Sequence, residues 1–179
     1  HIVSRAGHAE LSVVRDIVAP DPSQDVLMVA VVNRYVPARP AVAFIRGFGL
    51  TDGAIASSVA HDSHNIIAVG VDPRSMARAV NELIAQGGGF YAFSGGRGIG
   101  LELPIAGLMS ARPCEEVAER EAEVNRFVRD MGCPLPAPFM TLSFQSLLVV
   151  PQLKLGDRGL FDSVRQRFVS PVISSAVPR

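Results

Sequence analysis

The chain has 179 residues, 48% of them hydrophobic, which is enough for one domain with a proper core and too few for two large ones. Its formal net charge is +0 and no basic block occurs, so the electrostatic footprint of a nucleic-acid-binding protein is missing. No apolar run approaches the ~18 residues that span a membrane, and the two cysteines, Cys114 and Cys133, indicate no disulfide framework and fit a reducing cytoplasm.

Short apolar runs in the first half of the chain predict four strands. Residues 1–25 are mixed and end in a Pro/Asp/Ser turn cluster, so we interpret them as an N-terminal linker or edge segment. The first residue is His1 rather than Met, and we expect the chain to be a piece of something longer. The runs that predict buried strands are VLMVAVV (26–32), AVAFI (41–45), AIASSVA (54–60) and NIIAVGV (65–71).

A helix is predicted to follow the fourth run. Asp72 can cap it, and Pro73 suits the first helical position. The apolar residues expected on one face of this helix are Met76, Val80, Leu83 and Ile84. Glycines at 87–89 end the helix, and the segment 90–103, with its glycine-rich centre, predicts a β-hairpin.

A second helix is predicted from near Pro113 to the stop at Gly132. Glutamates crowd its N-terminal half, where the helix macrodipole favours them. Its apolar side is expected to consist of Val117, Val124, Val128 and Met131. The apolar run 139–151 predicts a last strand, and 170–179 is interpreted as a C-terminal tail without a clear pattern.

The order of these elements is strands, helix, hairpin, helix, strand. It predicts a single α+β domain over residues 26–169, with a mainly antiparallel or mixed β-sheet packed against two principal α-helices.

A polar turn interrupts the predicted core, in the stretch SSVAHDSHNIIAVG (57–70), which contains two of the four histidines. One interpretation is a hydrogen-bonded turn in which Asp62 and Asn65 satisfy backbone donors. The other is a polar surface that meets a partner or a substrate. On that interpretation the candidates for a substrate pocket or interdomain contact are Ser58, His61, Asp62, Ser63, His64 and Asn65.

Catalysis by the turn itself has little support in the sequence. On a strand, His61 and His64 would point to opposite faces, and a hydrolytic metal centre needs three or more ligands plus an open position. No G-x-S-x-G elbow is present for a serine nucleophile. A zinc centre of the nucleobase-deaminase type lacks a ligand, because the residue that would be its second cysteine is Val117. We therefore assign no catalytic and no metal-binding residue here, and a small metal hydrolase using both histidines remains an alternative.

Four blocks of sequence carry a resemblance to a known family. They are GFGLTDGAIASSVAHDSHNIIAVG (47–70), LPIAGLMS (103–110), PFMTLSF (138–144) and LKLGDRGL (153–160). From about Val31 to about Asp162, the chain resembles the C-terminal domain of bacterial adenine deaminase, a member of the amidohydrolase superfamily. The stretch VVNRYVPARP (31–40) departs from the family pattern, which leaves open whether adenine or a related aminopurine is preferred.

The resemblance implies a role in the hydrolysis of adenine to hypoxanthine and ammonia, in purine salvage and adenine catabolism. It implies a manganese or iron centre carried by a barrel domain that this chain lacks, with this chain shaping or capping that active site and binding no cofactor itself. The implied partners are that catalytic barrel domain and adenine, with no nucleic acid and no membrane. We expect a cytoplasmic homo-oligomer and an inactive isolated chain. The alternative is a stand-alone binding or scaffold module derived from this domain, without catalysis.

Overall fold

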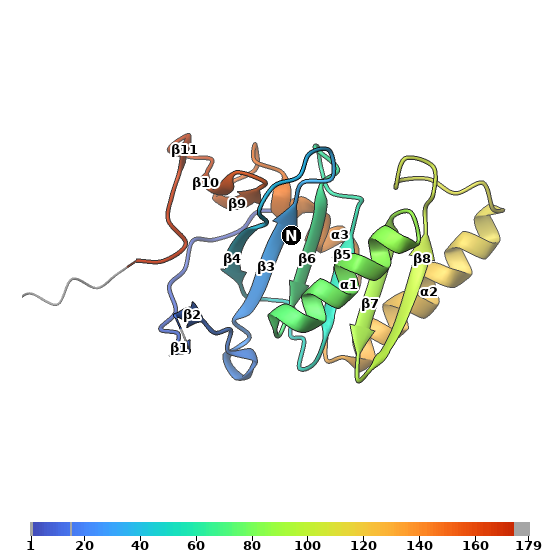
Figure 1. Ribbon diagram of the computed structural model, residues 1–179, viewed down its shortest axis with the longest axis horizontal. Coiled ribbons are helices and arrows are strands. Elements are labelled where there is room, and N and C mark those ends of the chain that lie inside the picture. Colours follow the sequence, from blue (N-terminus) through green and yellow to red (C-terminus); the bar gives the residue numbers. More distant parts are fainter. Residues whose placement is uncertain (1, 15, 174–179) are drawn as a thin grey trace, which may run out of the picture.

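A six-stranded antiparallel sheet lies at the centre of the molecule (Figure 1). The computed structural model describes residues 2–14 and 16–173. The strands lie in the order β4-β3-β6-β5-β7-β8, and every neighbouring pair is antiparallel. Their bounds are β3 (Leu27–Val32), β4 (Ala41–Ile45), β5 (Ala54–Ser57), β6 (Ile66–Gly70), β7 (Gly89–Ser94) and β8 (Arg97–Glu102). The predicted α+β class and the predicted hairpin are confirmed.

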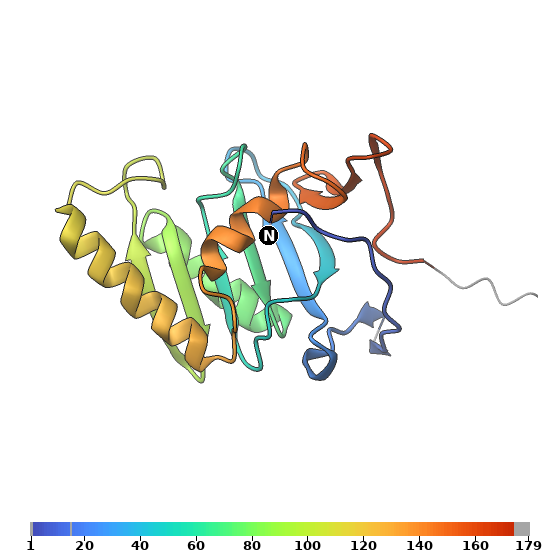
Figure 2. The same ribbon diagram turned by 180° about the vertical axis from the view of Figure 1, so that it is seen from behind.

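The two faces of the sheet differ in side-chain size. Alanines such as Ala56 and Ala68 point to one face, where the helix α1 (Pro73–Ala85) packs closely. Larger residues such as Ile55 and Val69 point to the other face, which α2 (Cys114–Asp130) and α3 (Pro138–Ser143) cover. Figures 1 and 2 show these helices on opposite sides of the sheet. Every residue of β5 and β6 is buried. Because successive residues of a strand point to opposite faces, both faces of the central sheet are therefore covered.

Helix α1 begins as predicted. The Asp72 carboxylate accepts hydrogen bonds from the amides of Arg74 and Ser75 at 2.8 and 2.9 Å. The buried stripe of the helix consists of Met76, Ala79, Val80 and Leu83. The prediction for Ile84 was wrong: it is 55% exposed, because it lies roughly 100° around the helix from Leu83, outside the stripe that the sheet covers.

Helix α2 also ends as predicted, with Gly132 in the left-handed region at φ 98°. Val124, Val128 and Met131 are buried against the sheet. The N-terminal half of the helix is largely exposed to solvent and extends past the sheet in Figure 2. Both cysteines are free thiols, with Cys114 exposed and Cys133 buried.

The segment 139–151, predicted as a strand, is not one. It is occupied by α3 and a 3-10 turn, η2 (Phe144–Ser146). Pro138 opens the helix, and Phe139 and Leu142 lie on the face that it buries. A short apolar run does not distinguish a buried strand from a buried helical turn by periodicity, and here the proline favours the helix.

Two smaller sheets flank the N-terminal edge of the fold, and the sequence did not predict them. One is a short pair, β1 (Val13–Val14) with β2 (Ile17–Val18), followed by the 3-10 turn η1 (Pro22–Gln24). The other has the order β11-β10-β9 and lies beside β4. Its strands are β9 (Leu153–Gly156), β10 (Gly159–Asp162) and β11 (Arg167–Phe168).

The first residues of the chain are held against the segment before β9. The Ser4 amide donates to the Pro151 carbonyl, and the Gln152 amide donates back to the Ser4 carbonyl, both at 3.0 Å. Part of the predicted linker or edge segment is therefore bonded to the domain. Within 2–14 and 16–173, no helix is long and apolar enough to cross a bilayer.

Candidate functional site

The polar turn lies at one end of the sheet, uppermost in Figure 1. The strands β3 and β5 end there, and β4 and β6 begin there, because neighbouring strands run in opposite directions. We call this end of the strands the upper edge, as distinct from the outer strands β4 and β8. It consists of the loops 33–40, 58–65, 86–88 and 103–113. Loops at strand ends are free of the ladder hydrogen bonds, so their side chains are available to a partner or a ligand.

His61 fixes the start of the turn to the end of α3 and to η2. Its amide donates to the Ser143 carbonyl at 3.2 Å, and the Ser146 hydroxyl donates to the His61 carbonyl at 3.1 Å. Its ring lies against Phe144, with the ring centroids 4.9 Å apart. The imidazole is half-buried. These contacts give the turn a defined orientation relative to η2.

His64 holds the end of the turn and carries an unsatisfied polar atom. Its backbone is in the left-handed region, at φ 52°, and its amide donates to the Ala60 carbonyl at 2.7 Å. Its Nδ1 atom is buried and has no hydrogen-bond partner among the described residues. A buried polar atom without a partner costs about 1–3 kcal/mol. A hydrogen-bond partner for His64 Nδ1 would therefore have to come from outside the described residues.

The loop after β3 supports the turn from the other side. The Arg34 amide donates to Oδ1 of the buried Asn65 at 3.2 Å, and the Tyr35 hydroxyl donates to the Ser63 carbonyl at 2.6 Å. Asn65 thus satisfies a backbone donor, as the structural interpretation of the turn predicted. Asp62 and Ser63 are exposed at the tip. The Asp62 carboxylate accepts no hydrogen bond from any described residue, so the same interpretation was wrong for Asp62.

Ser58 is placed differently from the other candidates. Its buried hydroxyl accepts from the Gly89 amide at 2.7 Å and donates to the Gly107 carbonyl at 2.5 Å. These contacts tie the start of β7 to the loop that follows β8. Ser58 therefore holds the upper edge together from within, while His61, Asp62, Ser63 and His64 lie at its surface.

The geometry of the turn favours hydrogen bonding over covalent or metal chemistry. The rings of His61 and His64 are 6.3 Å apart, centre to centre. No cluster of three or more His, Cys, Asp or Glu side chains that could hold a metal ion occurs in the described part of the chain. What the turn presents is a set of donors and acceptors, and a neutral imidazole can supply either role.

Two supporting residues were missed by the sequence reasoning. Arg34 reaches from the loop after β3 to the Ala106 carbonyl, with Nη2 2.5 Å from the oxygen, so it connects two loops of the upper edge. Tyr35, beside it, is the residue that holds the turn at Ser63. The available signal was an Arg-Tyr pair directly after a buried strand. Nothing in the sequence showed what that pair contacts.

Lys154, the only lysine, was also missed. It is 1% exposed on β9, where its ammonium donates to the Ile2 carbonyl at 2.7 Å and to Gln145 Oε1 at 3.4 Å. No carboxylate of the described residues forms an ion pair with it. Burial lowers the pKa of Lys154 to about 8. Because Gln145 belongs to η2, this buried cation connects the start of the chain to the element that holds His61.

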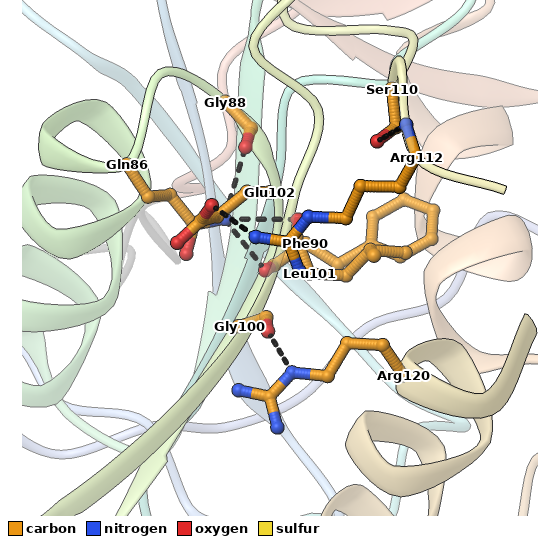
Figure 3. A network of polar contacts seen from close by, with 9 residues as sticks. All are labelled: Gln86, Gly88, Phe90, Gly100, Leu101, Glu102, Ser110, Arg112 and Arg120. Atoms are coloured by element: carbon orange, nitrogen blue, oxygen red, sulfur yellow. Dashed lines mark hydrogen bonds and ion pairs between the residues drawn. The ribbon is translucent and has the colours of Figure 1, made fainter. Parts of the chain in front are cut away.

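A surface hollow of about 350 Å³ lies beside β8 and is lined by Gly100, Glu102, Arg112 and Arg120 (Figure 3). Arg112 pairs with Glu102 at 3.3 Å, and Arg120 Nε donates to the Gly100 carbonyl at 2.7 Å. The pair is exposed on both sides, and such pairs contribute about 0–1 kcal/mol. The charges of the hollow are thus matched within the chain.

Comparison with curated proteins finds relatives that are called adenine deaminase. The protein of Salinibacter ruber is 57% identical over 151 residues, which are 83% of this chain and 28% of the relative. That of Methanothermobacter thermautotrophicus is 53% identical over 154 residues, 86% of this chain and 29% of the relative. That of Sulfurovum sp. is 55% identical over 148 residues, 82% of this chain and 28% of the relative.

The chain therefore spans between a quarter and a third of the length of these relatives. The model of the family described as the adenine deaminase C-terminal domain matches residues 1–167 of the 179. The expectation drawn from the four blocks of sequence is confirmed. The chain belongs to the adenine deaminase C-terminal domain family.

Proposed function

We propose that this chain serves as the C-terminal domain of an enzyme that hydrolyses adenine to hypoxanthine and ammonia in purine salvage. Its upper edge shapes or caps an active site carried by a separate catalytic domain. The observation that carries the proposal is the His61–Asn65 turn: a rigidly held polar turn with a buried, unsatisfied His64 Nδ1. It lies at a strand-end edge of a chain whose relatives are called adenine deaminase.

We assign the hydrolysis step itself to the catalytic domain. There, a manganese or iron centre would supply the Lewis-acid chemistry that activates water at neutral pH. The described residues of this chain do not fit such a centre, since they form no cluster of three ligating side chains. We propose no metal ligand and no catalytic residue in this chain.

The proposed work of the turn is recognition. Each neutral imidazole offers one donor and one acceptor, which is what the edge of a purine requires. His61 is held against Phe144, and His64 is fixed by its backbone bond to Ala60, so both rings present these atoms in set directions. Because His64 Nδ1 is buried in this domain, the group that pairs with it has to enter the turn from the substrate or from a loop of the catalytic domain.

The compartment and the assembly belong to the same proposal. Two free thiols fit a reducing cytoplasm, where thiols stay reduced. A homo-oligomeric state stays a prediction, checked by the mass of the full-length enzyme in solution.

The test uses the full-length enzyme. His64→Ala should reduce kcat or raise KM for adenine by a factor of roughly ten to a hundred, the equivalent of one lost hydrogen bond, with the metal content unchanged. Asp72→Ala is the matched control: its carboxylate caps α1 at the opposite end of the sheet, so the variant should lower the melting temperature and leave the kinetic constants as they are.

The opposite pattern would refute the role of the turn. If His64→Ala keeps wild-type kinetics and only melts earlier, the turn is a structural feature of this domain. If the full-length wild-type enzyme releases no ammonia from adenine with manganese present, the proposed substrate is wrong.

A further inference from the structure

Large apolar side chains are exposed at the upper edge. They come from two of its loops, 33–40 and 103–113, and from the last turn of α1, which ends at the same edge. We call them the edge cluster: Tyr35, Val36, Ile84, Ile105 and Met109, each between 44% and 62% exposed. At the opposite end of the sheet, the described loops 46–53, 71–72 and 95–96 contain no exposed large apolar residue. The exposed large apolar residues at that end of the molecule belong instead to the small β1–β2 pair: Val13, Val14 and Ile17 (Figure 1).

Direct contacts join the loops of the edge cluster into one surface. Arg34 links the loop 33–40 to Ala106, and Ser58 links Gly107 to the start of β7. On the α1 side, Gly87 lies against Pro104, and the Leu103 amide donates to the Gly88 carbonyl at 3.1 Å. Figure 3 shows the amide of Gln86, two residues after Ile84, bonded to carbonyls of both hairpin strands.

The composition of this surface is that of a protein interface. Apolar and aromatic side chains are surrounded by a polar margin, here Arg34, Asp62 and Ser63, which is how the core and rim of interfaces are arranged. Contiguous exposed apolar surface is uncommon on a protein that has no partner there. The buried, unsatisfied His64 Nδ1 lies in the same margin and also requires a group from outside the described residues.

The first described residues are connected to the element that holds the His61–Asn65 turn. Ile2 is bonded to Lys154, Lys154 is bonded to Gln145 in η2, and η2 holds His61. Figure 2 shows the N-terminal segment beside the end of α3. In the relatives, about 70% of the polypeptide lies outside the matched part, and the family is defined as their C-terminal domain. A domain tethered this close has a high effective concentration, so a modest apolar surface holds it.

We infer that the edge cluster is the surface on which the catalytic domain of the same polypeptide rests, with the His61–Asn65 turn at the margin of that contact. This inference rests on the proposed function, since it takes the partner to be the catalytic domain.

Methionine oxidation in the native full-length enzyme tests the inference. Met109 of the edge cluster and Met140 of α3 are 56% and 54% exposed in this domain. If nothing covered either residue, both should be oxidised by dilute peroxide at similar rates. Each rate is read by mass spectrometry of peptides and divided by the rate at the same methionine in the unfolded enzyme. We expect Met109 to be protected roughly tenfold or more, and Met140 much less.

Variants then assign the protection to the edge cluster. Tyr35→Ser combined with Ile105→Ser should raise the oxidation rate of Met109 toward its unfolded value. Val13→Ser combined with Ile17→Ser is the matched control, because both residues are exposed apolar side chains of the β1–β2 pair, which lies at the opposite end of the molecule in Figure 1, and it should change nothing.

Three results would overturn the inference: equal protection of Met109 and Met140, protection that survives the edge variant, or protection that disappears on dilution. The last would mean that a second copy covers the surface. The proposed function is judged separately, by ammonia release from adenine. An enzyme that is protected at Met109 but inactive on adenine would keep the docking surface and lose the substrate assignment.

Discussion

Replacing Lys154 by methionine would test what a buried cation without a carboxylate costs this fold. The pKa of Lys154 is about 8 in the folded chain and 10.5 when the side chain is in water, because burial disfavours the ammonium. Between these two pH values the unfolded chain binds more protons than the folded one. The free energy of unfolding must therefore rise as pH increases from about 8 to about 10.5.

The size of that rise follows from the same difference. The step from 10.5 to about 8 corresponds to roughly 3 kcal/mol, at about 1.4 kcal/mol for each pKa unit. The hydrogen bonds to Ile2 and Gln145 stabilise the ammonium and reduce this amount. We therefore expect a gain on the order of 1–2 kcal/mol from Lys154 between neutral pH and pH 10.

The assay is denaturant unfolding of the wild type, Lys154→Met and Lys154→Arg in the same buffers from pH 7 to pH 10. Burial also raises the pKa values of Tyr91 and Cys133, but both groups titrate in all three proteins and cancel in the difference. Methionine has no charge to lose, and arginine keeps its charge throughout this range, so neither variant should show the extra rise. Parallel pH profiles for the wild type and Lys154→Met would refute the reasoning.

Two further predictions concern the thiols and the isolated chain. A thiol count under native conditions should find Cys114 at once and Cys133 only after unfolding, because Cys133 is buried and burial raises its pKa; immediate reaction of both would contradict the packing at the end of α2. The 179-residue chain, incubated with adenine and manganese, should release ammonia at the buffer rate, and a metal-dependent turnover that survives repurification would revive the small metal hydrolase.

The elements predicted well are those whose signals are local. Asp72 and Pro73 mark the start of α1 in the sequence itself, and Gly132 marks the end of α2. The segment 139–151 failed because its helical fold depends on which face the sheet covers, which no local pattern shows. The strands β9 and β10 were not predicted, for a related reason. Each has only four residues, and the sheet that they form lies beside β4, a contact that no local pattern shows.

The candidate turn illustrates the same limit. Its polar residues were evident in the sequence. Which of them bond inward to the domain and which lie at the surface was not. Ser58 and His61 are three residues apart, yet Ser58 bonds inward to Gly107 while His61 lies over Phe144. Arg34 and Tyr35, which hold the turn, are about thirty residues earlier in the chain. Which loops meet depends on the order of the strands in the sheet, and this order could not be predicted from the sequence.

Strand order also explains why a partner surface is expected at the upper edge and nowhere else on the sheet. One face is covered by α1 and the other by α2 and α3, so neither face is available. The edge at β4 lies beside β9 and β10. At the edge of β8, Arg120 reaches across to occupy the Gly100 carbonyl, which discourages the addition of another strand. The two strand ends remain, and the end opposite the turn has no exposed large apolar side chain in its described loops. Of the two strand ends, the one that carries the edge cluster is also the one that carries the His61–Asn65 turn, so we expect the catalytic domain to meet the sheet there.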